Sequence, residues 1–121
     1  MPQIFFDTYA VIELIKGNPN YEKYLDYIPV INDFVLAELY YAILKDYGES
    51  KASNYLEIYS KVSIRISKEE IKSAMNFRRA NSKKKMSLVD CIGYMHAKSM
   101  KIKFLTGDKE FLHLDNIEFV K

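Results

Sequence analysis

Short hydrophobic stretches alternate along the chain with longer segments in which hydrophobic residues recur every three or four positions. In the segment 33–47 the hydrophobic residues fall on one face of a helix, and in the segment 62–66 they alternate as in a strand. The helical face of 33–47 comprises Leu36, Leu39, Tyr40, Ile43, Leu44 and Tyr47. We expect helices at residues 9–16, 33–47, 50–60, 67–81 and 87–100, and strands at residues 3–6, 28–31, 62–66, 102–105 and 117–120.

Strands that alternate with helices predict a parallel sheet with helices packed on both of its faces. We therefore expect an α/β fold, a three-layer sandwich around a short and mainly parallel central sheet, formed as one domain by residues 1–121. Ligands of such open sheets bind beyond the carboxyl ends of the strands. Residues that directly follow a strand, or lie early in the next helix, are therefore the first candidates for a functional site.

Four acidic residues occupy such positions. Asp7 follows the first strand and Asp108 follows the fourth. Asp90 lies in the first turn of the helix that begins at Ser87, and Glu38 lies in the second turn of the helix after the second strand. Carboxylates gathered at one edge repel each other, so the arrangement destabilises the fold unless a cation neutralises it.

Each of these acids also has a purely structural interpretation. Asp7 could cap the helix that follows it, and Asp90 could complete a capping box with Ser87. Asp108 could belong to a turn or cap a short helix. Glu38 lies too far into its helix to cap it, and its structural alternative is an ordinary solvated glutamate.

The composition narrows the classes of protein that remain. The longest hydrophobic runs are far shorter than the roughly 20 residues of a membrane span, so we expect no membrane segment. Cys91 is the only cysteine, which excludes an internal disulfide, a cysteine zinc site and a CxxC redox pair. Asp7 interrupts the first hydrophobic stretch, so we expect no signal peptide and a cytoplasmic protein.

The charges are distributed unevenly, although the net charge is only +2. Residues 1–60 contain four Lys and nine acidic residues, whereas residues 78–103 contain eight Lys and Arg and one acid, Asp90.

Carboxylates without His or Cys suit Mg²⁺ or Mn²⁺ rather than zinc, and such ions assist the hydrolysis of phosphodiesters. A basic strip beside them suits a polyanion. The candidate phosphate contacts are Arg78, Arg79, Lys83, Lys84 and Lys85.

The residues around these acids resemble the PIN-domain ribonucleases, and most closely the VapC-type toxins of toxin–antitoxin pairs. The resemblance rests on the order and spacing of four segments, which are Ile4–Thr8, Val35–Leu39, Leu88–Asp90 and Phe104–Phe111. It implies a PIN-like fold and an endoribonuclease that uses Mg²⁺ or Mn²⁺ and a metal-activated water to hydrolyse RNA. It further implies a homodimer that a small antitoxin silences by placing its tail in the acidic site. By this resemblance the metal ligands are Asp7, Glu38, Asp90 and Asp108, and the Thr106 hydroxyl supports the site.

Other functions account less well for the same residues. A response-regulator receiver needs a phospho-accepting Asp after its third strand, and Ser67 and Lys68 stand there instead. A haloacid-dehalogenase-type phosphatase needs a second acid two residues after Asp7, where the chain has Tyr9. The remaining alternative is a non-catalytic module of the same fold that binds RNA or a protein.

Overall fold

The computed structural model describes residues 2–121. Five strands form one sheet in the order β3-β2-β1-β4-β5, and every neighbouring pair is parallel. The predicted α/β class with a short parallel sheet is therefore confirmed. The strands are β1 (Gln3–Phe6), β2 (Ile28–Asn32), β3 (Ser63–Ile64), β4 (Phe104–Thr106) and β5 (Ile117–Phe119).

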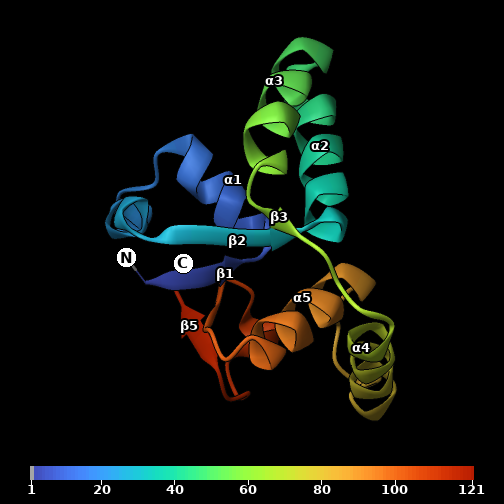
Figure 1. The fold of residues 1–121 in the computed structure, drawn as a ribbon. Coiled ribbons are helices and arrows are strands. Elements are labelled where there is room, and N and C mark those ends of the chain that lie inside the picture. The colour runs from blue at the N-terminus through green and yellow to red at the C-terminus, as the bar shows by residue number, and fades with distance from the viewer. Residues whose placement is uncertain (1) are drawn as a thin grey trace.

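Helices cover both faces of this sheet. Figure 1 shows α1 and the antiparallel pair α2 and α3 on one side of the strands, with α4 and α5 on the other. No helix within residues 2–121 is both long enough and hydrophobic enough to cross a membrane. The helices are α1 (Thr8–Lys16), α2 (Asp33–Tyr47), α3 (Glu49–Ser60), α4 (Lys68–Ala80) and α5 (Leu88–Ser99), with the 3₁₀ turns η1 (Pro19–Asp26) and η2 (Lys109–Phe111).

The order of the strands reverses between β1 and β4. The chain proceeds from β1 outward to β2 and β3, and then returns through α4 and α5 to β4 on the opposite side of β1. In open α/β sheets the ends of the two strands at such a reversal diverge and leave a crevice for a ligand. The segments that follow Phe6 and Thr106 therefore flank the expected binding position.

Apart from Gln3 and Thr106, the central strands β1 and β4 are hydrophobic, because helices bury both of their faces. Ile4, Phe5 and Phe6 are all buried, as are Phe104 and Leu105 of the neighbouring strand. This continuous burial fixes the direction in which β1 and β4 leave the core, and with it the positions of the residues that follow them.

Gly93 lets α5 approach the sheet closely. A Cβ atom at this position would lie 3.1 Å from ring atoms of both Phe5 and Phe104, which is tight for any side chain. The close approach brings the first turn of α5, including Asp90, near the carboxyl ends of β1 and β4.

Polar side chains fix the starts of the helices as the sequence predicts. Ser67 and Glu70 form the predicted capping box at the start of α4, and Ser87 and Asp90 form a second one at the start of α5. Asn32 is the cap of α2, because its side-chain oxygen accepts from two backbone N–H groups at 3.1 Å each. These caps place the helix starts to within one residue of the predicted positions.

Three local predictions are wrong. The strand expected at residues 62–66 has only two residues, because β3 lies at the edge of the sheet and pairs with β2 only through Ser63 and Ile64. The strand expected to end at residue 105 ends one residue later, because Thr106 belongs to β4, where its backbone pairs with β5. Tyr47 is 56% exposed although it continues the hydrophobic stripe of α2, because that stripe extends beyond the part of α2 that packs on the core.

Candidate active site

The four predicted acids line one open cavity of about 530 Å³. The cavity lies at the reversal between β1 and β4. Asp7 follows β1 and Asp108 follows β4, while Glu38 comes from α2 and Asp90 from α5. We call this cavity the acidic pocket, and its lining residues are Asp7, Thr8, Tyr9, Glu38, Ser87, Asp90, Gly107, Asp108, Lys109 and Lys121.

Asp7 is the most deeply buried of the acids, with 3% of its surface exposed. One carboxylate oxygen, Oδ1, accepts from the backbone N–H of Ala10 at 2.7 Å and so caps α1. The other, Oδ2, accepts from the Thr106 hydroxyl at 2.5 Å. Burial raises the pKa of Asp7 to about 7, and the neighbouring charges of Asp90 and Asp108 add to this rise, while the two hydrogen bonds oppose it.

Asp90 is held by the capping box of α5. Its Oδ2 accepts from the backbone N–H of Ser87 at 3.3 Å, and the Ser87 hydroxyl accepts from the backbone N–H of Asp90 at 3.1 Å. Burial raises the pKa of Asp90 to about 6, the charges of Glu38 and Asp108 raise it further, and the hydrogen bonds with Ser87 lower it. Both Asp7 and Asp90 therefore hold a proton more tightly than an exposed aspartate does.

Glu38 and Asp108 are the other two acids that line the acidic pocket. The Thr8 hydroxyl donates to Oε1 of Glu38 at 2.5 Å, which joins α2 to the first residue of α1. Oδ1 of Asp108 accepts from the backbone N–H of Glu110 at 3.0 Å and caps η2. The structure thus gives Asp7, Asp90 and Asp108 the capping roles that their sequence positions also allow, and it brings them together with Glu38 in the same pocket.

Thr106 connects two of the acids. Its hydroxyl donates to Asp7 and accepts from the backbone N–H of Asp108 at 3.0 Å, and the side chain is fully buried. Thr106 therefore fixes the relative positions of the segments that follow β1 and β4. It does not line the pocket itself.

The donor set of the acidic pocket fits a hard divalent cation. Its possible ligands are carboxylate and hydroxyl oxygens, with no His or Cys side chain among the lining residues. Within residues 2–121, no three acidic, histidine or cysteine side chains lie close enough together to enclose an ion as they stand. Mutual repulsion contributes to the raised pKa values of Asp7 and Asp90, although burial is the larger cause of both.

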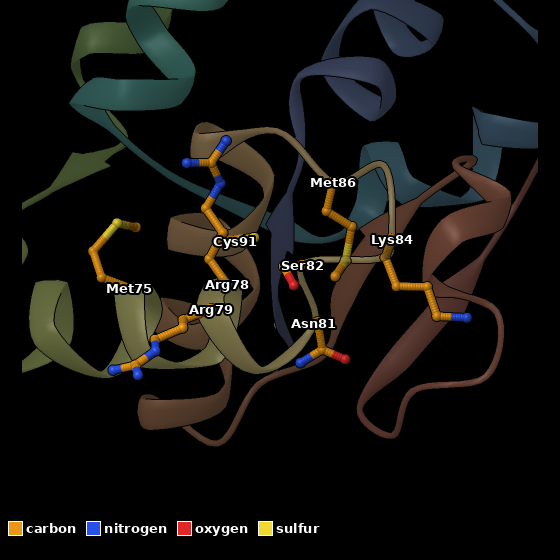
Figure 2. A pocket seen from close by; sticks show the side chains of 8 residues that line it. All are labelled: Met75, Arg78, Arg79, Asn81, Ser82, Lys84, Met86 and Cys91. Carbon is orange, nitrogen blue, oxygen red and sulfur yellow. The ribbon is translucent and has the colours of Figure 1, made fainter.

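The five basic residues predicted to contact phosphate lie outside the acidic pocket and fall into two groups. Arg78 and Arg79 are in the last turn of α4, and the lysines are in the connector between α4 and α5. Arg78, Arg79 and Lys84 line a second cavity, of about 340 Å³, which Figure 2 shows from close by. Lys83 and Lys85 are exposed but do not line it.

Two residues of the acidic pocket that the sequence analysis does not identify are basic. Lys121 donates from Nζ to the carbonyl oxygen of Gly107 at 3.2 Å, and its ammonium group lies 5.4 Å from the centre of the Tyr9 ring. Lys109 lies beside them in the lining. Lys109 directly follows Asp108 and could have been found by that adjacency, whereas Lys121 reaches the pocket only because β5 pairs with β4.

Comparison with known proteins places the chain in a family. The PIN domain family matches residues 4–117, and no curated protein matches the sequence. Among solved structures, a toxin–antitoxin complex from Klebsiella pneumoniae has a TM-score of 0.73 and 21% identity over 95% of both chains. VapC20 of Mycobacterium tuberculosis, described as a sarcin-ricin loop cleaving toxin, has a TM-score of 0.78 and 16% identity over 98% of this chain and 99% of that one.

A third structure is VapBC2 from Rickettsia felis, bound to a DNA fragment from its promoter. It has a TM-score of 0.76 and 21% identity over 98% of this chain and 99% of that chain. At these identities the structures establish the shared fold, and the family match over residues 4–117 establishes the relationship. The chain therefore belongs to the PIN domain family.

Proposed function

We propose that the chain is a metal-dependent endoribonuclease, formed as one catalytic domain by residues 1–121, and the toxin of a toxin–antitoxin pair. One observation carries the proposal. Four carboxylates from four separate segments converge in a single open pocket at the reversal of the sheet, where their repulsion is unfavourable unless a cation binds. Membership of the PIN domain family supports the same assignment.

In this proposal Asp7, Glu38, Asp90 and Asp108 hold Mg²⁺ or Mn²⁺. Held there, such an ion would supply polarisation of the scissile phosphodiester and a lower pKa for the attacking water. The chain itself orients the carboxylates: Thr106 and the backbone of Ala10 fix Asp7, and the capping box fixes Asp90.

The two lysines of the pocket have a complementary role in the proposal. Lys109 and Lys121 place positive charge at the same cavity as the acids. The phosphate groups of RNA repel carboxylates, so ammonium groups at the pocket lower the electrostatic barrier to their approach. Arg78, Arg79, Lys83, Lys84 and Lys85 extend this positive surface along the RNA backbone.

The biological assignment rests on the related structures. They include a toxin–antitoxin complex from Klebsiella pneumoniae, VapBC2 from Rickettsia felis, and VapC20 of Mycobacterium tuberculosis, a sarcin-ricin loop cleaving toxin. For this chain we propose RNA as substrate, a small antitoxin as inhibitor, a homodimer as the active assembly and the cytoplasm as the compartment. The proposed antitoxin acts by occupying the acidic pocket.

A non-catalytic module is the second candidate, because Asp7, Asp90 and Asp108 each have a sufficient structural role as helix caps. It does not account for Glu38, which caps no helix and lines the same pocket. It also gives no reason for the presence of both Asp7 and Asp90 in one pocket, where burial and the charges of neighbouring acids raise their pKa values.

Calorimetric titration with Mn²⁺ separates the two candidates. We expect the wild type to bind Mn²⁺ and the Asp7→Asn/Asp90→Asn double variant to lose this binding, since asparagine retains the caps but not the charge. The matched control is Asp26→Asn/Asp46→Asn, which removes two exposed carboxylates away from the pocket. Equal binding by the wild type and the first double variant would contradict the proposed metal site.

Cleavage is tested on the same proteins with a pool of random-sequence single-stranded RNA. We expect cleavage in the presence of Mn²⁺ by the wild type and by the control, and none by Asp90→Asn. Mn²⁺-dependent cleavage by Asp90→Asn at the wild-type rate would refute the assignment of the acidic pocket as the active site.

A further inference from the structure

His96 is a buried titratable residue that takes no part in the acidic pocket. It lies on α5 with 1% of its surface exposed, and its ring packs against the ring of Phe5 in β1 with 5.7 Å between the ring centroids. Its two ring nitrogens face polar side chains of two further elements, which are Asn32 at the end of β2 and Glu70 on α4. The protonation of His96 therefore depends on these partners and not on solvent.

Asn32 determines which nitrogen of the His96 ring carries the proton. The side-chain oxygen of Asn32, Oδ1, accepts from the backbone N–H groups of Phe34 and Val35 at 3.1 Å each and so caps α2. The amide nitrogen, Nδ2, can only donate, and it lies 3.1 Å from Nδ1 of His96. Nδ1 must therefore accept, so His96 is neutral and carries its hydrogen on Nε2.

The groups on the other side of the ring favour a positive charge but do not prevail. Nε2 lies 3.8 Å from Oε2 of Glu70, and the ring also donates to the backbone of Arg65. Asp33, the acid at the start of α2, accepts instead from the Ser63 hydroxyl at 2.6 Å. Burial lowers the pKa of His96 below its usual value of 6.5, although Glu70 and the Arg65 backbone oppose this shift.

A second proton on the His96 ring would place two donors against each other. The proton would go to Nδ1, which faces Nδ2 of Asn32, and both side chains are buried. The conflict is relieved only if the Asn32 amide turns over and presents Oδ1 to the ring. That oxygen then leaves the backbone N–H groups of Phe34 and Val35, which have no other acceptor in the first turn of a helix.

We infer that His96 is a pH-sensitive switch for the start of α2: the neutral ring keeps Asn32 in its capping position, and a proton on the ring releases the cap. The released turn begins at Asp33, one turn before Glu38 of the acidic pocket. Neither a metal ion nor RNA takes part in the switch, so the inference does not depend on the proposed nuclease function.

The direction of the pH dependence follows from the two states of the cap. With the cap closed, His96 stays neutral below pH 6.5, whereas with the cap released the ring regains its usual pKa of 6.5 and takes up a proton. Acid therefore favours release. A ring with this pKa is protonated about 30 times more often than neutral near pH 5, so release becomes up to about 30-fold more favourable there than near pH 8.

Hydrogen exchange followed by NMR, with EDTA present, measures this release. The protection factors of the Phe34 and Val35 amides are divided by that of the Ile43 amide, which lies further along the same helix. We expect this ratio to fall by up to about 30-fold between pH 8 and pH 5 in the wild type. A ratio that does not change with pH would overturn the switch.

Two substitutions of Asn32 test whether the coupling passes through its amide. Asn32→Ser keeps a capping oxygen but places no donor against His96, so we expect the protection ratio to become independent of pH. Asn32→Asp also keeps the cap and replaces the facing donor with an acceptor, so we expect the pKa of His96 to rise above 6.5. An NMR titration of the ring measures this pKa, with the exposed His113 as the reference resonance. An unchanged pH dependence in Asn32→Ser, or an unchanged pKa in Asn32→Asp, would contradict the inference.

Glu70→Gln is the matched control on the opposite side of the ring, and it applies even if the Asn32 variants fail to fold. Glutamine retains the capping box of α4 but removes the charge that faces Nε2. We expect the pKa of His96 to decrease while the protection of Phe34 and Val35 near pH 8 stays at the wild-type level. A loss of that protection near pH 8 would mean that α2 responds to the packing of α4 and not to a proton on His96, which would overturn the switch.

Discussion

Replacing the buried carboxylate of Asp7 with an amide should stabilise the metal-free protein at alkaline pH. Asp7 is 3% exposed and carries a pKa raised to about 7, mainly by burial. Asn is an equally good helix cap, so Asp7→Asn keeps the start of α1 while removing the charge. The proposed catalytic acid is thus expected to weaken the fold that holds it.

The sign and size of the change in the free energy of unfolding follow from the protonation of Asp7 in the folded and the unfolded chain. Below about pH 4 the Asp7 carboxyl group is protonated in both the folded and the unfolded chain, and it contributes no pH dependence. As the pH rises from about 4 to about 7 the unfolded chain releases the proton and the folded chain retains it, so the free energy of unfolding decreases. At about 1.4 kcal/mol for each pH unit between the two pKa values, the full loss above pH 7 is roughly 4 kcal/mol.

The hydrogen bonds of the variant offset part of this gain. In Asp7→Asn the remaining oxygen still accepts from the Ala10 N–H, but the amide nitrogen must donate to the Thr106 oxygen, whose own hydrogen then loses its acceptor. One lost hydrogen bond costs about 1 kcal/mol. We therefore expect Asp7→Asn to raise the free energy of unfolding by about 2–3 kcal/mol near pH 8 and to leave it nearly unchanged near pH 4.5.

Urea unfolding followed by far-UV circular dichroism, with EDTA present throughout, measures both values. Asp26→Asn, which alters an exposed carboxylate, controls for the general effect of losing a negative charge. Asp90→Asn should show a smaller effect of the same sign, because the pKa of Asp90 is raised only to about 6. Destabilisation by Asp7→Asn near pH 8, or an effect that is independent of pH, would refute the reasoning.

Three further substitutions or treatments test other parts of the structure. Gly107→Ala places a Cβ 2.2 Å from a Tyr9 ring atom, so we expect a loss of about 1–3 kcal/mol in urea unfolding, and a smaller loss in the Tyr9→Ala background if that contact is the cause. Asn32→Ala removes the cap of α2 and the amide that donates to His96 at 3.1 Å. We expect it to lower the free energy of unfolding in urea by about 2–4 kcal/mol. A decrease below about 1 kcal/mol would show that neither hydrogen bond contributes to stability. Burial raises the pKa of the Cys91 thiol to about 11. Iodoacetamide near pH 8 should therefore label Cys91 only after the chain unfolds. Rapid labelling of the folded chain, detected by mass spectrometry, would contradict the burial of Cys91.

The part of the site that follows strands could be predicted from the sequence. Asp7 and Asp108 follow buried hydrophobic runs that only a central strand explains, and parallel strands bring such positions to one edge. Asp90 follows from the same argument because the capping box with Ser87 fixes where α5 begins. Glu38 could be placed on a helix but not in the pocket by periodicity alone, since its position depends on the packing of α2.

The basic residues show where such prediction ends. Lys83, Lys84 and Lys85 are consecutive and chemically identical, yet only Lys84 lines the second cavity, at the end of α4. The connector has neither helical nor strand periodicity, so nothing in the sequence indicates which side chain points inward. Lys121 is likewise unpredictable at the acidic pocket, because its position depends on the pairing of β5 with β4 across a 3₁₀ turn.

Each of the three aspartates of the acidic pocket is anchored to the backbone through one carboxylate oxygen, and Asp7 is held in addition by the Thr106 hydroxyl. Their oxygens accept from the main-chain N–H groups of Ala10, Ser87 and Glu110. Any residue other than proline offers the same donor, so the identity of the side chain at these three anchoring positions has little influence on where the carboxylates point. Apart from Thr106, substitutions around the pocket can therefore be extensive before the aim of the carboxylates changes, which leaves the rim of the pocket free to vary.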